Sequence, residues 1–320
     1  MARPTEQELI DDILLLSEEV WENRVTRVAL DDWLDNFVGR ELGVAEERIQ
    51  ALHLLSHFAY FGQGELRHLL LALYRDLFRY PIVQQIRQDN GMTRDSGFIE
   101  AAFREELRRT RFVGMGNPSE SGSHLLYYFR QENGLHRDLF VSPHQLLDGQ
   151  ASSVGTGLVP SELKRIVFID DVLGSGQQAL EYGRTVLSDI REVAARSGSN
   201  IDIWYLVLFA KPEGLINARR APFDVVQAVH ELDASQAVFS SNSYAFTDLV
   251  WSPSLSDSEK MSRGYGEPLF PGNSVGYREG QLLLGLHHNV PDNTLPVFWN
   301  DEHVKSWKTL FKRYPKDAKW

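Results

Sequence analysis

The first part of the chain has apolar positions that recur at helical spacing. Apolar residues share one face in segments near residues 6–21, 30–38, 45–61 and 65–80, with Gly43 and Pro81 expected to end the second and fourth helices. Beyond residue 110, short β-branched and aromatic runs alternate with helical patterns and glycine-rich loops, which is typical of a parallel α/β sheet. The sequence therefore predicts a helical domain over residues 1–110 and an α/β domain over residues 111–320.

Strands and helices alternate in the expected α/β domain. Strands are expected at residues 111–116, 139–142, 165–170, 203–210 and 225–229. Helices are expected at about residues 121–133, 177–196 and 212–218. This order predicts a Rossmann-like parallel sheet covered by helices.

Composition narrows the class of protein. A chain of 320 residues with 42% hydrophobic content can form two domains with proper cores. The net charge of -11 argues against broad nonspecific attraction to nucleic acid or to anionic membranes. The absence of cysteine excludes disulfides, thiolate metal sites and a cysteine nucleophile, and no apolar run approaches membrane-spanning length. A soluble cytoplasmic protein is expected.

The segment from Arg165 to Gln177, RIVFIDDVLGSGQ, carries the most specific chemistry. Its apolar run suits a buried parallel strand, and Asp170 and Asp171 follow at the carboxyl end, where open α/β sheets bind ligands. Ionised carboxylates accept hydrogen bonds, so the pair can hold the two hydroxyls of a ribose ring. The glycines at 174 and 176 permit a tight turn, and the helix that starts at Gln177 offers unpaired N–H groups to a phosphate. An ordinary strand-to-helix turn, in which the acidic pair caps the helix, is the alternative.

This segment resembles the phosphoribosyl pyrophosphate (PRPP) signature of the type I phosphoribosyltransferases. The resemblance implies that Asp170 and Asp171 contact the ribose hydroxyls and contribute to holding Mg²⁺, which is bound mainly through the ligand. It also implies that the 5′-phosphate is wrapped by Val172, Leu173, Gly174, Ser175, Gly176 and Gln177. The chain departs from the family pattern at Gly174 and Gln178, where family members commonly carry threonines.

A second glycine- and serine-rich turn follows the first expected strand of the α/β domain. By the resemblance, it occupies the place of the pyrophosphate-binding loop, with the candidate residues Gly116, Asn117, Ser119, Glu120, Ser121 and Gly122. Glu120 can reach Mg²⁺ or cap the next helix. That helix places Arg130 either toward the site or on the surface. The small polar loop over residues 148–158 has the position of a catalytic lid, although an ordinary surface connection explains its composition equally well.

The segment from Gly285 to Trp299 is expected to add a late strand and a polar loop to the same sheet. Asn289 and Asn293 are candidate substrate ligands, and Phe298 or Trp299 could stack on a ring, although turn chemistry followed by core aromatics is the competing explanation. Neither His53 with His57 nor the adjacent pair His287 and His288 is expected to bind a metal ion.

Three tracts together, residues 116–133, 169–176 and 289–299, resemble the bacterial conflict-system branch of the phosphoribosyltransferase superfamily. Members of that branch are proposed effectors or accessory proteins of antiphage loci, including retrons, so a reverse transcriptase–RNA complex or other defence proteins are implied as partners. The arginines near residues 104–111 fit RNA contacts or a solvated helix face, and the second is favoured.

The function expected from these features is a PRPP- and Mg²⁺-dependent enzyme that transfers ribose 5-phosphate to a nitrogen acceptor or to water. Two alternatives remain open: a noncatalytic nucleotide-sensing subunit of a defence complex, and an effector that degrades nucleotides.

Overall fold

The computed structural model describes residues 3–116, 121–142, 163–196, 200–247 and 251–313. The chain forms two compact units. Unit 1 combines Met1–Leu66 with Leu232–Trp320, and unit 2 is the continuous segment Arg67–Glu231. The units therefore do not follow the division expected at residue 110. Residues 73–79 contact the strands at residues 202–210 and 225–231, and the helices at residues 80–89 and 96–108 pack next to that segment and to each other.

Unit 1 is mainly helical, with one small sheet. Its elements are α1 (Glu6–Glu19), α2 (Arg27–Leu34), α3 (Val44–Ser56), β1 (Ala59–Phe61), α12 (Leu255–Leu269) and β6 (Leu284–Leu286), with short 3₁₀ turns at Ala234–Gln236, Tyr244–Phe246 and Pro296–Phe298. A capping box begins α1, because the Thr5 side chain accepts from the Glu8 N–H while the Glu8 carboxylate accepts from the Thr5 N–H. β1 and β6 pair in parallel, with Tyr60 opposite Gly285.

Aromatic side chains dominate the core of unit 1. Trp33 is fully buried, stacks on Phe298 with ring centroids 5.4 Å apart and meets Phe37 edge-on at 5.1 Å. Its indole N–H donates to the Val297 carbonyl at 2.9 Å. The ring thus joins α2 to a segment more than 250 residues later in the chain.

Two of the expected N-terminal helices have different ends. The helix expected at residues 45–61 stops at Ser56, and residues 59–61 form β1 because their backbone pairs with β6. Pro81 does not end the fourth helix. A π-helical turn at Leu73–Arg79 links α4 (Gln63–Ala72) to α5 (Tyr80–Asp89), and Pro81 lies in the first turn of α5. A proline is tolerated there because the π turn has already changed the hydrogen-bond spacing, with the Tyr80 N–H donating to Arg75 O.

Unit 2 is built on a parallel sheet with the strand order β2–β3–β4–β5. The strands are β2 (Thr110–Gly114), β3 (Arg165–Leu173), β4 (Asp202–Ala210) and β5 (Val225–Glu231). The helices are α5, α6 (Ser96–Arg108), α7 (Ser121–Glu132), α9 (Gln177–Arg184), α10 (Val186–Arg196) and α11 (Pro212–Ala218), with most of α4 and a 3₁₀ turn at Arg137–Leu139. This arrangement confirms the α/β fold class, a parallel sheet flanked by helices.

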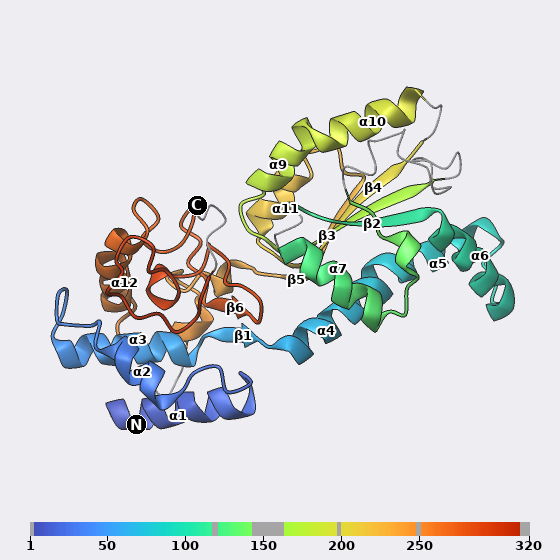
Figure 1. The fold of residues 1–320 in the computed structure, drawn as a ribbon. Coiled ribbons are helices and arrows are strands. Elements are labelled where there is room, and N and C mark those ends of the chain that lie inside the picture. The colour runs from blue at the N-terminus through green and yellow to red at the C-terminus, as the bar shows by residue number, and fades with distance from the viewer. Residues whose placement is uncertain (1–2, 117–120, 143–162, 197–199, 248–250, 314–320) are drawn as a thin grey trace. The chain divides into compact units, whose positions relative to one another are not determined.

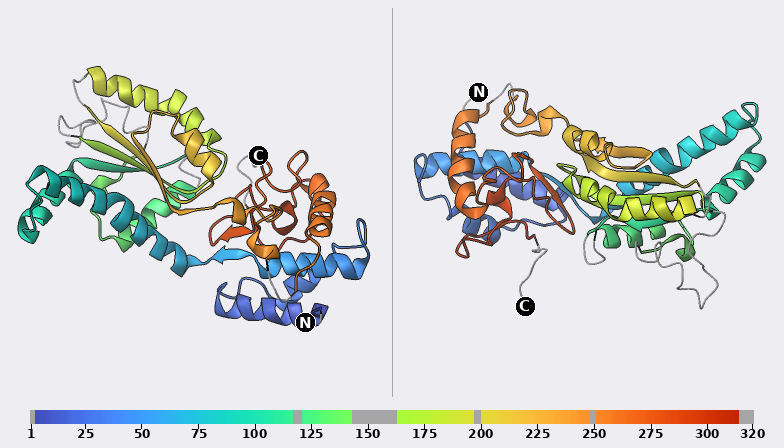
Figure 2. Two further views of the ribbon diagram at one scale, coloured as in Figure 1. Left: turned by 180° about the vertical axis from the view of Figure 1, so that it is seen from behind. Right: turned by 90° about the horizontal axis from the view of Figure 1, so that it is seen from above.

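Helices cover both faces of this sheet, as Figures 1 and 2 show. One face packs against α9, α10 and α11 through a core that contains Phe168, Tyr205 and Leu187. The other face meets α7 and the π-helical turn, with Phe112 edge-on to both Phe78 and Phe129. Burial on both faces explains why the strand sequences are almost continuously apolar.

Two elements of unit 2 differ from the sequence prediction. Residues 139–142 contain no strand, since Arg137–Leu139 is a 3₁₀ turn and Phe140 makes a single bridge to Phe112. The helix expected at residues 177–196 is divided at Thr185 into α9 and α10. Apolar spacing alone could not reveal this break, because the buried face continues through both helices.

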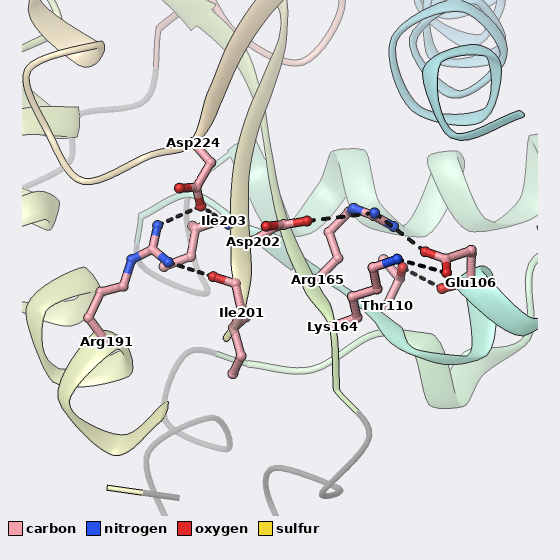
Figure 3. Close-up of polar contacts among 9 residues, drawn as sticks. All are labelled: Glu106, Thr110, Lys164, Arg165, Arg191, Ile201, Asp202, Ile203 and Asp224. Atoms are coloured by element: carbon pink, nitrogen blue, oxygen red, sulfur yellow. Dashed lines mark hydrogen bonds and ion pairs between the residues drawn. The ribbon is translucent and has the colours of Figure 1, made fainter. Parts of the chain in front are cut away.

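Ion pairs fasten the amino ends of β3 and β4 to the helices around them (Figure 3). Arg165 is buried, lies between Glu106 of α6 at 3.5 Å and Asp202 at 3.8 Å, and covers the Trp204 ring at 4.7 Å. Arg191 of α10 pairs with Asp224 at 2.5 Å. These contacts lie at the opposite end of β3 from the acidic pair.

None of the helices in the described ranges is long and apolar enough to cross a membrane.

Candidate functional site

Asp170 and Asp171 lie near the carboxyl end of β3, and both are largely buried, with exposed fractions of 6% and 9%. The two oxygens of Asp170 each accept a hydrogen bond: Oδ1 from the Asp171 N–H at 2.9 Å and Oδ2 from the Tyr205 O–H at 2.9 Å. Oδ1 of Asp171 accepts from the Val172 N–H at 2.8 Å. The pair is therefore held in place by the strand itself and by the neighbouring strand β4.

The environment of the pair favours its protonated form. Burial raises the pKa of Asp170 well above its usual range, and the neighbouring carboxylate of Asp171 raises it further, while the hydrogen bond from Tyr205 opposes the shift. Two carboxylates this close cannot easily both be ionised. We infer that the pair retains a proton to a higher pH than an isolated carboxyl group would.

A glycine-rich turn follows the pair. Gly176 has φ +76°, a backbone conformation that L side chains rarely adopt, and it forms the N-cap of α9. The turn is fastened to α11, because Asn217 Nδ2 donates to the Ser175 carbonyl at 2.9 Å and a Cβ added at Gly214 would meet Gly174 O at 2.4 Å. Glycine at 214 thus lets the backbone of α11 touch the turn directly.

The turn after β3 is shorter than the predicted phosphate-binding segment at residues 172–177. Val172 and Leu173 are strand residues of β3, and the Leu173 carbonyl accepts from the Lys211 N–H at 2.9 Å. The backbone that remains for an anion comprises residues 174–176 and the N-terminus of α9 at Gln177. The N–H of Gln177 donates weakly to Ser175 Oγ at 3.4 Å. A phosphate oxygen is a better acceptor for such N–H groups than a hydroxyl is.

The second candidate loop starts beside the acidic pair. The Met115 N–H donates to Ile169 O at 3.0 Å, and Gly116, with φ +90°, accepts from the Tyr182 hydroxyl at 3.3 Å. Ser121 and Gly122 lie in the first turn of α7. The other candidates of this loop, Asn117, Ser119 and Glu120, lie outside the described residues. The expected lid at residues 148–158 also lies outside them. The structure therefore places the beginning of this loop at the carboxyl edge of the sheet.

Three lower-ranked candidates have mainly structural surroundings. Arg130 lies in the last turn of α7 with its guanidinium 5.9 Å from the Tyr127 ring centre. Asn293 is buried and donates to the Tyr277 carbonyl at 3.0 Å, and Asn289 pairs through its backbone with Leu286. Both asparagines belong to unit 1, so they are not part of the unit that carries the acidic pair.

The sequence predicts that the segment around these asparagines contributes a late strand at the four-stranded sheet, and the structure differs. The four-stranded sheet consists of β2 to β5, and the strand β6 pairs with β1 in a separate two-stranded sheet. Phe298 and Trp299 are core residues of unit 1, with exposed fractions of 0% and 7%. The competing explanation, turn chemistry followed by core aromatics, describes what the structure shows.

The histidines also make local contacts. His53 Nε2 lies 2.7 Å from Ala245 O, His57 Nδ1 lies 2.9 Å from His53 O, and His287 pairs with Glu22 at 3.3 Å. Across the described parts of the chain, no group of three or more His, Cys, Asp or Glu side chains could hold a metal ion.

Sequence reasoning missed two polar residues near the site. Lys211 follows β4 at the carboxyl edge and precedes α11; burial lowers its pKa, and Glu213 opposes that shift. The same rule that selected Asp170, a polar residue directly after a buried strand, could have found Lys211. Tyr205 lies inside an apolar strand, and only the register of β4 against β3 reveals that its hydroxyl meets Asp170.

A cavity of about 400 Å³ lies elsewhere, in unit 1, between α1, α2 and α3. Its charged groups pair with one another, since Arg27 contacts Asp31 at 2.9 Å and Arg48 contacts Asp35 at 2.8 Å. The residues that line this cavity include neither an adjacent carboxylate pair nor a glycine-rich turn. We therefore place the candidate site at the carboxyl end of β3.

The fold and the edge of the sheet define a class: α/β proteins in which a parallel sheet carries a carboxylate pair followed by a glycine turn and a helix N-terminus. The family model PRTase-CE matches residues 30–313, and the chain belongs to this family. Among solved structures, the chain is similar to orotate phosphoribosyltransferase from Aeropyrum pernix, at 18% identity and a TM-score of 0.21, over 42% of this chain and 72% of that chain. The comparison with curated proteins gave no match.

Proposed function

We propose that this chain is a phosphoribosyltransferase-like enzyme that binds PRPP with Mg²⁺ and transfers ribose 5-phosphate to a nitrogen acceptor or to water. The observation that carries the proposal is the sequence of groups at the end of β3: the buried pair Asp170 and Asp171, the Gly174–Gly176 turn and the N-terminus of α9. Membership of the PRTase-CE family supports it.

Each part of the site has a role in this proposal. The acidic pair accepts the ribose hydroxyls, the backbone of residues 174–177 holds the 5′-phosphate, and the segment that begins at Gly116 lies where the pyrophosphate would leave. The bond from the anomeric carbon to the pyrophosphate oxygen breaks, a bond to the acceptor nitrogen or water oxygen forms, and the acceptor releases a proton. Positive charge develops on the ribose ring, and the nearby carboxylates stabilise it.

The donor set fits Mg²⁺ only in part. Hard carboxylate oxygens of Asp170 and Asp171 suit the ion, but the described residues provide no third acidic or histidine ligand. Mg²⁺ commonly uses one or two carboxylates together with phosphate oxygens, so the ion would arrive with the pyrophosphate. When bound, it neutralises charge on the leaving group.

Calorimetric titration of PRPP with Mg²⁺ tests the proposal. The native chain should bind, and the double variant Asp170→Asn, Asp171→Asn should bind at least about tenfold more weakly, since each charge-assisted hydrogen bond contributes roughly 1.5–3 kcal/mol. Asparagine matches the shape of a protonated carboxyl, so folding should be preserved.

The matched control is Asp11→Asn, Asp12→Asn, which changes the same adjacent pair of residue types on the exposed face of α1. It alters the net charge equally and should bind PRPP as the native chain does. Equal loss in both double variants would show a general charge effect, and no binding to the native chain would overturn the proposal.

A noncatalytic nucleotide sensor is the second candidate. It is favoured by Asp170, whose two oxygens already accept protein hydrogen bonds, and by the glycine and glutamine that stand at 174 and 178. A sensor would bind PRPP or a related nucleotide and release no pyrophosphate, whereas a nucleotide-degrading effector would release free base.

The setting that we propose is a bacterial antiphage system with a reverse transcriptase–RNA complex or other defence proteins as partners. Support comes from the resemblance of residues 116–133, 169–176 and 289–299 to the conflict-system branch. In a phage-plating assay with the complete system, Asp171→Asn should abolish protection; full protection with this variant would contradict the role.

A further inference from the structure

Asp170 has a partner on the neighbouring strand. Tyr205 of β4 pairs in register with Phe168 of β3, two residues before Asp170, so both side chains project on the same face of the sheet. Tyr205 has an exposed fraction of 1%, and its O–H donates to Asp170 Oδ2 at 2.9 Å. Two donors from different strands thereby fix the two oxygens of one carboxyl group.

The tyrosine ring is itself held in place. Phe223, shortly before β5, stacks on Tyr205 with ring centroids 5.0 Å apart and an interplanar angle of 24°. Phe223 also meets Phe168 edge-on at 6.1 Å. The stack holds the ring in the position from which its hydroxyl reaches Asp170.

We propose that Tyr205 is a positioning residue that fixes the orientation of Asp170 and, through it, the acidic pair that meets the ligand. The inference rests on the proposed function for the identity of the ligand. It adds a residue that lies inside an apolar strand and touches no ligand itself.

The charges around Asp170 are few. Among the described residues, the groups that shift its pKa are Asp171 on its own strand and Tyr205 on β4. The helices packed on this face carry Tyr182 and Glu181 on α9, and Lys211 and Glu213 at the start of α11. Tyr182 donates to Gly116 O, Glu181 accepts from Gln177, and Glu213 raises the pKa of Lys211.

Removing the tyrosine hydroxyl should weaken binding through Asp170. Tyr205→Phe keeps the ring and its stack on Phe223, but it leaves Asp170 Oδ2 without its donor from β4. The carboxyl group can then turn about its remaining hydrogen bond from the Asp171 N–H, so the acidic pair is less often oriented to meet the ligand.

Tyr265→Phe is the matched control. Tyr265 is another buried tyrosine, in unit 1, whose O–H donates to the buried carboxylate of Glu47 at 2.7 Å. Tyr265→Phe removes the same kind of tyrosine-to-carboxylate hydrogen bond in the unit that does not carry the acidic pair, so it should lower stability and leave PRPP affinity unchanged.

The experiment measures two quantities for the native chain and both variants: the midpoint of urea-induced unfolding without ligand, and the affinity for PRPP with Mg²⁺. Each variant loses one buried hydrogen bond, so both unfolding midpoints should fall by similar amounts. Tyr205→Phe should bind PRPP about tenfold more weakly than the native chain does. Tyr265→Phe should keep the native affinity.

The outcomes separate this inference from the proposed function. Native PRPP affinity in Tyr205→Phe, or an equal loss of affinity in Tyr265→Phe, would overturn the positioning role. A lower unfolding midpoint of Tyr205→Phe without PRPP binding to any variant or to the native chain would support the contact with Asp170 and overturn the proposed ligand.

Two further variants complete the test. In an Asp170→Ala background, Tyr205→Phe should cause no further loss of PRPP affinity, since the carboxyl group that it positions is gone; an undiminished loss would contradict the inference. If Tyr205→Phe fails to fold, Phe223→Leu keeps the hydroxyl and removes the ring that stacks on Tyr205, and it should also weaken PRPP binding.

Discussion

Replacing Gly214 with alanine should weaken both the fold of unit 2 and its affinity for phosphate ligands. The added Cβ would lie 2.4 Å from Gly174 O and 2.6 Å from Leu173 O, distances that require the backbone of the turn to move. Overpacking of this kind costs about 1–3 kcal/mol. Because the displaced atoms belong to the turn proposed to hold the 5′-phosphate, PRPP affinity should fall at least about tenfold. Urea denaturation and calorimetry measure the two effects.

The control for this variant is Gly64→Ala in α4. A Cβ at this glycine meets nothing within 4 Å, so the substitution should leave PRPP affinity unchanged and should stabilise the helix by up to about 1 kcal/mol. Gly214 has no positive φ, and its sensitivity therefore comes from space alone. Native-like stability and affinity in Gly214→Ala would show that α11 does not support the turn.

Trp33→Ala should produce the largest loss of stability in unit 1, about 3–5 kcal/mol. The substitution removes a fully buried indole that stacks on Phe298, meets Phe37 edge-on and donates to Val297 O. The carbonyl of Val297 also accepts from the Trp307 indole at 3.1 Å, so the loss arises mainly from the cavity. Far-UV circular dichroism during urea denaturation reports the change without relying on tryptophan fluorescence.

Val28→Ala on the same helix is the comparison. Val28 is 71% exposed, and its truncation should change stability by no more than about 0.5 kcal/mol. A similar small effect of Trp33→Ala would mean that the aromatic core of unit 1 is not what holds α2 to the C-terminal segment.

Local patterns predicted the sheet of unit 2 well. β3, β4, β5 and α11 lie within a few residues of their expected ranges, because long apolar strands between polar loops are a strong signal. The residues of β1 were predicted as part of a helix, because three residues form a strand only through pairing with β6, more than 200 residues later in the chain. The same long-range pairing helps bring the C-terminal segment into unit 1, so the compact units differ from the division expected at residue 110.

The candidate site was predictable where one segment contains all its parts. Asp170, Asp171 and the turn at 174–176 are contiguous, and the structure places them together at the edge of the sheet. The contribution of Tyr205 could not be predicted, because it depends on strand register and on a neighbouring ring. For Asn289 and Asn293 the sequence could not show that they belong to unit 1, or that the Asn293 side chain donates to the Tyr277 carbonyl, because asparagine is common in structural turns as well.

The division of unit 1 between the two ends of the chain affects the order in which the protein can fold during synthesis. The ribosome produces α1, α2 and α3 before unit 2, yet Trp33 and Phe37 can contact Phe298 and Trp307 only after unit 2 has been synthesised. Unit 2 is continuous and can close its core while those helices still expose apolar rings. A nascent chain that has just emerged from the ribosome as far as Glu231 would thus carry a folded α/β unit and an N-terminal segment with exposed apolar side chains. We expect chaperones to bind that segment until unit 1 can fold.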